Sequence, residues 1–161
     1  MASIETTVEI ERPRSEVFEY MTDLSNAKEW NTELVSRSYD GDAIRVGSTG
    51  VDEFRMGRRL VAMPWRVTEY LPPQRLVIEF SGTFAATAIF SFEESRGGTV
   101  LGCRTALRPR GLWRLAAPMM AREGRRADHE QFHRAKGILE QRDPRSPTRP
   151  GSAEAQPVRK E

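Results

Sequence analysis

Cysteine and long apolar runs are the scarcest features of this sequence. Among 161 residues the only cysteine is Cys103, which excludes an internal disulfide and a zinc site built from cysteines alone. No run approaches the roughly 20 apolar residues that a membrane-spanning helix needs. The first residues also lack the basic start and apolar stretch of a signal peptide. We therefore expect a cytoplasmic protein in which Cys103, within a strand-like segment, is an inert thiol.

Net charge is also small, at +2, but the charges are unevenly distributed. Residues 1–54 contain twelve acidic and five basic residues, a balance of −7, whereas residues 104–142 contain ten basic and four acidic residues, a balance of +6. Two oppositely charged, solvated surfaces are the favoured interpretation. An anionic ligand or lipid against the basic segment stays open. Basic residues are not interleaved with aromatic ones and no known module is present, so we expect no nucleic-acid binding.

The apolar pattern predicts one α+β domain over residues 1–142, since the chain is too short for two full cores. Alternation over residues 3–10 predicts a strand, and Pro13 and the polar residues near position 25 favour two short helices after it. Six antiparallel strands should follow, because short alternating runs are separated by glycine and proline turns near residues 33–39, 48–56, 59–70, 75–81, 84–93 and 99–108.

A long helix is predicted from about residue 112 to residue 141. One side of it carries Ala127, Gln131, Phe132, Ala135, Ile138 and Leu139, while Pro118 should kink or restart it and Gly124 should weaken it. Only this helix is large enough to cover one face of the sheet, and a twisted sheet curling around it can leave an apolar hollow. Residues 143–161 contain four prolines and one sizeable aliphatic residue, which predicts a disordered tail.

Several short motifs occur in an order that resembles the SRPBCC superfamily, the START-like or polyketide cyclase/dehydrase proteins. They lie at residues 10–13, 17–23, 26, 30, 46–50, 67–76, 98–99 and 136–140. The resemblance implies a helix-grip fold, with a seven-stranded curved sheet wrapped around the terminal helix. It also implies a site for a lipid, sterol, polyketide or other hydrophobic molecule between sheet and helix. No bound cofactor is expected.

Candidate ligand-binding residues are bulky apolar side chains on the inward phase of the strands and on the helices. Alanines beside aromatic residues matter because small side chains leave space. Methionines adapt to varied apolar partners, and Leu115 is expected on the helix with two of them. The candidates are Phe18, Trp30, Phe54, Met56, Trp65, Val67, Ile78, Phe80, Phe84, Phe90, Met119 and Met120.

A polyketide cyclase/dehydrase enzyme, the first alternative, would also need acid–base groups in the same hollow. No catalytic residue is assigned, but five polar residues of the central strands are candidates. Because lone charges are seldom buried, we favour a solvated surface position for each of them. Strand phase nevertheless groups one of them, Asp52, with Phe54. The five are Asp52, Arg66, Glu69, Tyr70 and Arg104.

His129, Glu130 and His133 form a literal HExxH motif, which in zinc proteases places two imidazoles on one helical face. Here both histidines should point away from the apolar face of the helix, and the chain has no third histidine. We therefore predict no zinc enzyme.

The favoured hypothesis is a carrier or binding protein for a small hydrophobic molecule. The second alternative is a module that contacts a membrane or a protein partner through the basic helix. Neither the ligand nor the oligomeric state is predicted from the sequence.

Overall fold

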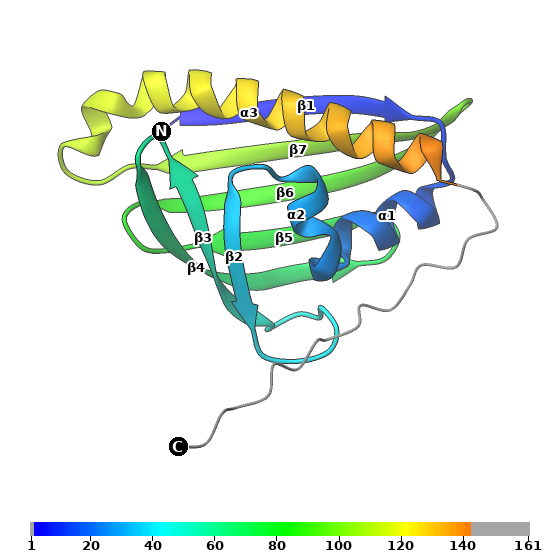
Figure 1. The fold of residues 1–161 in the computed structure, drawn as a ribbon, viewed down its shortest axis with the longest axis horizontal. Helices are drawn as coiled ribbons and strands as arrows, with labels where there is room; N and C mark the ends of the chain where they lie inside the picture. The colour runs from blue at the N-terminus through cyan, green and yellow to red at the C-terminus, as the bar shows by residue number, and fades with distance from the viewer. Residues whose placement is uncertain (1, 143–161) are drawn as a thin grey trace, which may run out of the picture.

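A computed structural model describes residues 2–142 (Figure 1). In chain order its elements are β1 (Ala2–Ile10), α1 (Arg14–Thr22), the 3-10 turn η1 (Leu24–Asn26), α2 (Ala27–Trp30), β2 (Leu34–Tyr39), β3 (Thr49–Met56), β4 (Arg59–Leu71), β5 (Arg75–Phe80), β6 (Ala85–Ser95), β7 (Gly98–Arg108) and α3 (Trp113–Gln141). This order confirms the predicted α+β helix-grip architecture. The predicted disordered tail lies outside the described residues.

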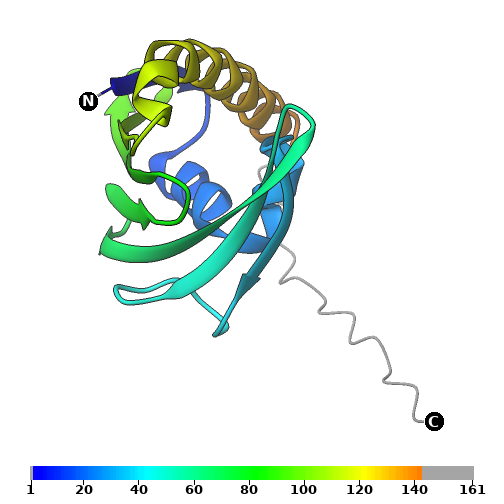
Figure 2. The ribbon, with the colours of Figure 1, turned by 90° about the vertical axis from the view of Figure 1, so that its left-hand side faces the viewer.

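All seven strands form one antiparallel sheet in the order β1-β7-β6-β5-β4-β3-β2. Consecutive strands from β2 to β7 are neighbours, and β1 joins the far side of β7. Alternation decides the faces: Met63, Trp65 and Val67 are buried on the inner face, whereas Pro64 and Arg66 between them are exposed. The sheet curls strongly, so that Figure 2 shows it bending around the helices rather than lying flat beneath them.

Helix α3 runs along β1 at the edge of the sheet (Figure 1). Its buried side chains are Ala121, Gln131, Phe132, Ala135 and Leu139, which largely match the predicted apolar face. The helix is continuous through Pro118 and does not restart there. Gly124 has a packing reason, because a Cβ atom at this position would collide with the Cδ1 atom of Ile4 on β1.

The C-terminal half of α3 is fixed by many contacts. Phe132 packs on Trp30 of α2, with ring centroids 6.3 Å apart. The Arg134 Nε donates to the carbonyl oxygen of Glu29 at 2.6 Å, and the Lys136 Nζ donates to that of Glu9 at 2.6 Å. Glu140 accepts from the backbone N–H of Glu11 at 2.9 Å and from Lys136 at 2.8 Å. These bonds to the charged form lower the pKa of Glu140.

The interior is filled at one end and hollow at the other. Beneath the second half of α3, side chains of α1, β1, β6 and β7 form a continuous cluster that includes Phe18, Phe92, Leu101 and Phe132. Beneath the first half, a looser cluster of Ile4, Met63, Phe84, Ala86, Leu107 and Ala121 surrounds open space. The fold thus positions any internal site near the start of α3.

Candidate ligand-binding site

A cavity of about 570 Å³ lies between the inner face of the sheet and the start of α3. Most of its wall is apolar and comes from β1, β3, β4, β5, the β5–β6 loop, β6, β7 and α3: Ile4, Phe54, Met56, Val61, Met63, Phe80, Phe84, Ala86, Leu107, Trp113, Met119 and Met120. Its volume falls within the roughly 300–1,000 Å³ of small-molecule sites in proteins. The shape and the lining both suit an apolar guest.

Small residues opposite large ones leave this space open. On the sheet, Ala86 of β6 pairs with Phe80 of β5 on one side and Leu107 of β7 on the other. Phe80 turns instead toward Phe54 of β3, and their rings meet edge to face with centroids 6.2 Å apart. On the helix, Gly124 contributes no side chain to the wall. Small residues on both walls therefore contribute to the open space.

The structure brings half of the predicted ligand-binding residues around this cavity: Phe54, Met56, Phe80, Phe84, Met119 and Met120. The other half lies in the packed interior. Phe18, Trp30 and Phe90 belong to or contact the cluster beneath the second half of α3, and Trp65, Val67 and Ile78 form part of a third cluster. Leu115, which was expected beside the two methionines, is 84% exposed and does not line the cavity.

Several lining residues were missed by the sequence reasoning. Thr105 shares the strand phase of Cys103 and Leu107, so alternation could have found it. Trp113 lies in the first turn of α3 and closes one side of the cavity. Charged residues at the rim come from a loop, a hairpin and the helix and carry no periodic signal; they are Glu33, Arg55, Arg59 and Glu123.

An acidic group lies on α3 just beyond the residues that line the cavity. Asp128 follows Gly124 by one helical turn and is half-buried. Burial raises its pKa to about 6, and the negative charge of Glu33 adds to this effect. On the sheet opposite, burial raises the pKa of the Cys103 thiol to about 12, with a further contribution from Asp128. Cys103 is thus an inert thiol by environment, whereas Asp128 can exchange a proton near neutral pH.

Asp52 is fully buried, and the favoured interpretation of a surface charge was wrong for this residue. Its carboxylate accepts two bonds from Arg37 of β2, at 2.7 and 2.5 Å, and one from the Trp65 Nε1 at 2.8 Å. A charge can be buried when a bidentate partner neutralises it. All of these hydrogen bonds link neighbouring strands, so Asp52 has a structural role and is not available to bind a ligand.

The other polar candidates of the central strands lie away from the cavity. Arg66 and Arg104 are exposed. Glu69 pairs with Arg75 at 3.0 Å at the surface. Tyr70 packs against Phe18 with ring centroids 5.6 Å apart.

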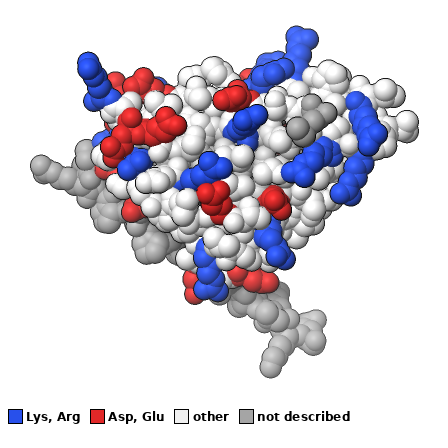
Figure 3. All heavy atoms as spheres, turned by 180° about the vertical axis from the view of Figure 1, so that it is seen from behind, with Lys and Arg blue, Asp and Glu red and all other residues white. Residues whose placement is uncertain are grey.

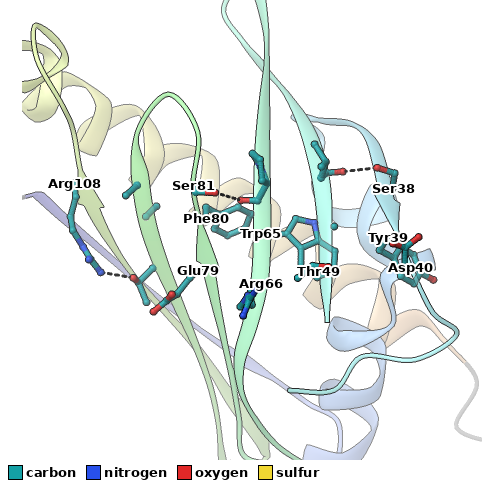
Figure 4. Close-up of a pocket in the computed structure, with 16 residues that line it drawn as sticks. Ser38, Tyr39, Asp40, Thr49, Trp65, Arg66, Glu79, Phe80, Ser81 and Arg108 are labelled. Carbon is teal, nitrogen blue, oxygen red and sulfur yellow. Dashed lines mark hydrogen bonds between the residues drawn. The ribbon is translucent and has the colours of Figure 1, made fainter. Parts of the chain in front are cut away.

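A larger hollow, of about 720 Å³, lies on the outer face of the sheet (Figure 4). Figure 4 shows α3 behind the strands, with Arg66, Glu79 and Arg108 on the near side. The Arg108 guanidinium donates to the Thr87 hydroxyl at 2.8 Å. An apolar molecule placed here would strip water from charged groups without replacing their hydrogen bonds. The inner cavity is therefore the better site for a hydrophobic molecule despite its smaller volume.

The HExxH residues lie on the exposed side of α3. The rings of His129 and His133 have centroids 4.1 Å apart, and Glu130 pairs with Arg126 at 3.2 Å. Within residues 2–142, no group of three potential metal-ligating side chains is found. The same described part of the chain contains no helix with the length and apolarity to cross a bilayer.

Comparison with known proteins agrees with this geometry. A sequence model of the family described as "Polyketide cyclase / dehydrase and lipid transport" matches residues 1–136. The chain belongs to this family. The match confirms the resemblance to the SRPBCC superfamily. Among curated protein sequences, no significant match to the chain is found.

Solved structures share the fold of this polyketide cyclase/dehydrase and lipid transport family member at low identity. TTHA0849 from Thermus thermophilus has a TM-score of 0.74 at 12% identity, over 85% of this chain and 96% of that one. CV1439 from Chromobacterium violaceum has a TM-score of 0.69 at 15% identity, over 87% and 99%. The di-domain ARO/CYC StfQ of the steffimycin biosynthetic pathway has a TM-score of 0.74 at 14% identity, over 86% of this chain and 51% of StfQ.

Replacing Asp52 by alanine in this family member should strongly destabilise the fold. Arg37, only 15% exposed, and the indole N–H of Trp65 would both lose their partner. We expect the free energy of unfolding in urea to fall by about 3 kcal/mol. As the control, Glu69→Ala removes a surface ion pair and should cost less than about 1 kcal/mol. Equal losses in the two variants would contradict a structural role for Asp52.

Replacing Asp128 by asparagine should stabilise the protein above pH 6 and have little effect near pH 4. The pKa in the folded state, about 6, lies above the ordinary value of 3.8, so the folded form binds this proton more tightly. Its contribution to stability is present at low pH and is lost as pH rises through that window. Asparagine mimics the protonated form, and the gain at pH 7.5 should be about 1–2 kcal/mol.

Urea unfolding at both pH values measures this difference. Glu130→Gln, on the exposed face of the same helix, provides the control and should show no comparable gain. A parent protein as stable as Asp128→Asn at pH 7.5 would show that the carboxyl group is fully solvated.

Proposed function

We propose that this chain binds a small hydrophobic molecule, lipid-like or polyketide-like, in the cavity between the inner face of the sheet and the start of α3. The single observation that carries the proposal is an apolar space of about 570 Å³ inside a domain whose other end is solidly packed. Apolar surface moved from water into such a space is stabilised by about 25 cal/mol per Å². The cavity can therefore supply affinity without any covalent step.

The distribution of polar groups favours an amphiphilic guest. The deep wall is made of aromatic, aliphatic and methionine side chains, whereas the charged residues Arg55, Arg59, Glu33 and Glu123 belong to the surrounding loop, hairpin and helix. A molecule with an apolar body and one polar end could bury its body and keep that end near these charges. Met119 and Met120 adapt to guests of different shape, which suits a carrier.

Family membership supports the same function, because the family description includes both lipid transport and polyketide cyclisation. StfQ, with a similar fold, is a di-domain ARO/CYC protein of a steffimycin pathway. At 14% identity that likeness carries the fold alone. The carrier and enzyme hypotheses are therefore distinguished by experiments on this chain.

Filling the cavity should abolish binding without unfolding the protein. Ala86 lines the space, so Ala86→Met would extend a side chain into it. We expect the dissociation constant for cis-parinaric acid, read from its fluorescence, to rise by about tenfold or more. The matched control is Ala85→Met, whose side chain lies on the outer face of the same strand. It should leave the dissociation constant unchanged.

The unfolding midpoint of both variants shows whether the fold is intact. Native mass spectrometry of the parent protein, purified from its own host, would identify any molecule that occupies the cavity. A parent protein that binds neither cis-parinaric acid nor a host molecule would refute the proposal. Equal affinities of Ala86→Met and the parent would move the site elsewhere.

A second candidate function is acid–base catalysis on a polyketide-like substrate in the same cavity. Asp128 is the specific observation that favours it, since a carboxyl group whose pKa is about 6 can both accept and donate a proton near neutral pH. Asp128 lies one helical turn beyond Gly124, which lines the cavity, and its charge acts on Cys103, whose sulfur is 3.6 Å from the hydroxyl group of the cavity-lining Thr105. A general acid–base group of this kind contributes typically 10²–10⁴-fold to a rate.

Turnover of a linear poly-β-ketone thioester, followed by mass spectrometry, separates catalyst from carrier. If the chain is an enzyme, Asp128→Asn should lower kcat by about a hundredfold while binding of cis-parinaric acid is retained. Product formation that is unaffected by this substitution would exclude Asp128 as the proton-transfer group. Binding without any product would leave the carrier function alone.

A further inference from the structure

Large apolar side chains are exposed around the mouth of the cavity. Leu112 and Leu115, at the start of α3, are 85% and 84% exposed, and Trp113 and Met119 beside them are exposed too. Met56 and Leu60 are exposed on the β3–β4 hairpin. We call these six residues the mouth patch. Single exposed leucines need no explanation, but a group of six large apolar side chains marks a surface that contacts a protein or a membrane.

The mouth patch is continuous with the cavity wall. Met56, Trp113 and Met119 belong to both, and the hairpin and the start of α3 therefore lie on two sides of one opening. Figure 2 looks at the molecule from this end and shows the first turns of α3 beside the curled sheet. Whatever covers the patch also covers the way into the cavity.

Arginines accompany these apolar residues on both segments. Arg55, Arg58 and Arg59 belong to the β3–β4 hairpin, and Arg110 and Arg114 are exposed around the start of α3. Seen from behind in Figure 3, basic side chains gather toward the right-hand edge, the end where α3 begins, with no acidic side chain among them there. Glu33 and Glu123 also belong to the rim of the cavity, so the five arginines leave this surface with a net positive charge beside its exposed apolar groups.

Charge decides between the candidate occupants. A second copy of the chain docked patch to patch would bring the arginines of one copy against those of the other, and like charges at an interface oppose binding. Anionic phospholipid headgroups attract arginines, and the acyl boundary below them accepts leucine, methionine and tryptophan side chains. With five arginines and two glutamates, Glu33 and Glu123, beside the apolar groups, the mouth carries a net positive charge that suits that layered arrangement.

We propose that the mouth patch docks on a bilayer that contains anionic phospholipids. Leu112 and Leu115 insert among the acyl chains, and the hairpin arginines contact the phosphate groups. In this orientation the cavity opens toward the lipid, so that a hydrophobic molecule passes between membrane and protein without crossing water. The transfer step rests on the proposed ligand-binding function, whereas docking itself does not.

Co-flotation with vesicles tests the proposal. The parent protein should float with vesicles of equal parts phosphatidylcholine and phosphatidylglycerol, should float less with phosphatidylcholine alone, and should be released as salt is raised. Leu112→Ser/Leu115→Ser should lower the partition coefficient by about tenfold or more. Arg58→Ser should lower it by about fivefold. The matched control is Leu71→Ser, which replaces a 50% exposed leucine at the far end of β4 and should change nothing.

Several results would overturn the proposal. One is equal flotation with both kinds of vesicle, and another is equal loss in Leu71→Ser and in the double variant. A dimer that appears in analytical ultracentrifugation and is lost in the double variant would assign the patch to a second copy instead. Ala86→Met, whose mouth patch is intact, should still float. If the parent floats but binds no cis-parinaric acid, ligand binding fails while docking stands.

Discussion

The unequal attachment of α3 is the constraint on which the rest of this structure depends. Its second half is tied to α2 and to the β1 turn by Phe132, Arg134, Lys136 and Glu140. Midway, Gly124 lets the helix touch Ile4 of β1. Among the described residues, the first turns of α3 make no such hydrogen bonds, and Trp113, Met119 and Met120 there face the cavity. Because α3 is fixed through its second half, space remains between its first turns and the sheet.

A second constraint shapes the far wall of that space. Asp52, Arg37 and Trp65 link β3, β2 and β4 through buried, charge-assisted hydrogen bonds. Burying a charged pair brings little net stability compared with apolar packing, but removing one partner is costly. The cluster therefore fixes how these three strands lie on one another, and with them the Phe54 side chain that faces the cavity. The strands that carry the buried polar cluster thus also carry part of the apolar cavity wall.

Periodicity predicted most of the fold. Alternation and turn residues located every strand to within a residue or two, and the apolar face of α3 from residue 127 onward was identified by the same means. Burial of Asp52 was missed because its partner lies 15 residues earlier on another strand, where no local pattern reveals it. Leu115 precedes the buried Ala121 by six residues, which at about 100° per residue places it roughly 120° around α3 from the buried face, so helical periodicity itself predicts an exposed position.

Half of the candidate site was open to prediction for the same reason. Phe54, Phe80 and Phe84 follow strand phase, which depends only on neighbours in the chain. Phe18 and Val67 follow an inward phase equally well and still pack in solid clusters. Phase tells which way a side chain points, whereas the position of the void depends on where α3 parts from the sheet.

The single cysteine also makes it possible to measure how often the domain opens. Cys103 is its only cysteine, it is buried on the inner wall of the sheet, and its pKa of about 12 keeps the thiol protonated at neutral pH. A maleimide or disulfide reagent can reach it only when the domain opens, so the labelling rate counts openings without any engineered probe. A ligand that stabilises the closed domain should therefore lower the labelling rate of Cys103.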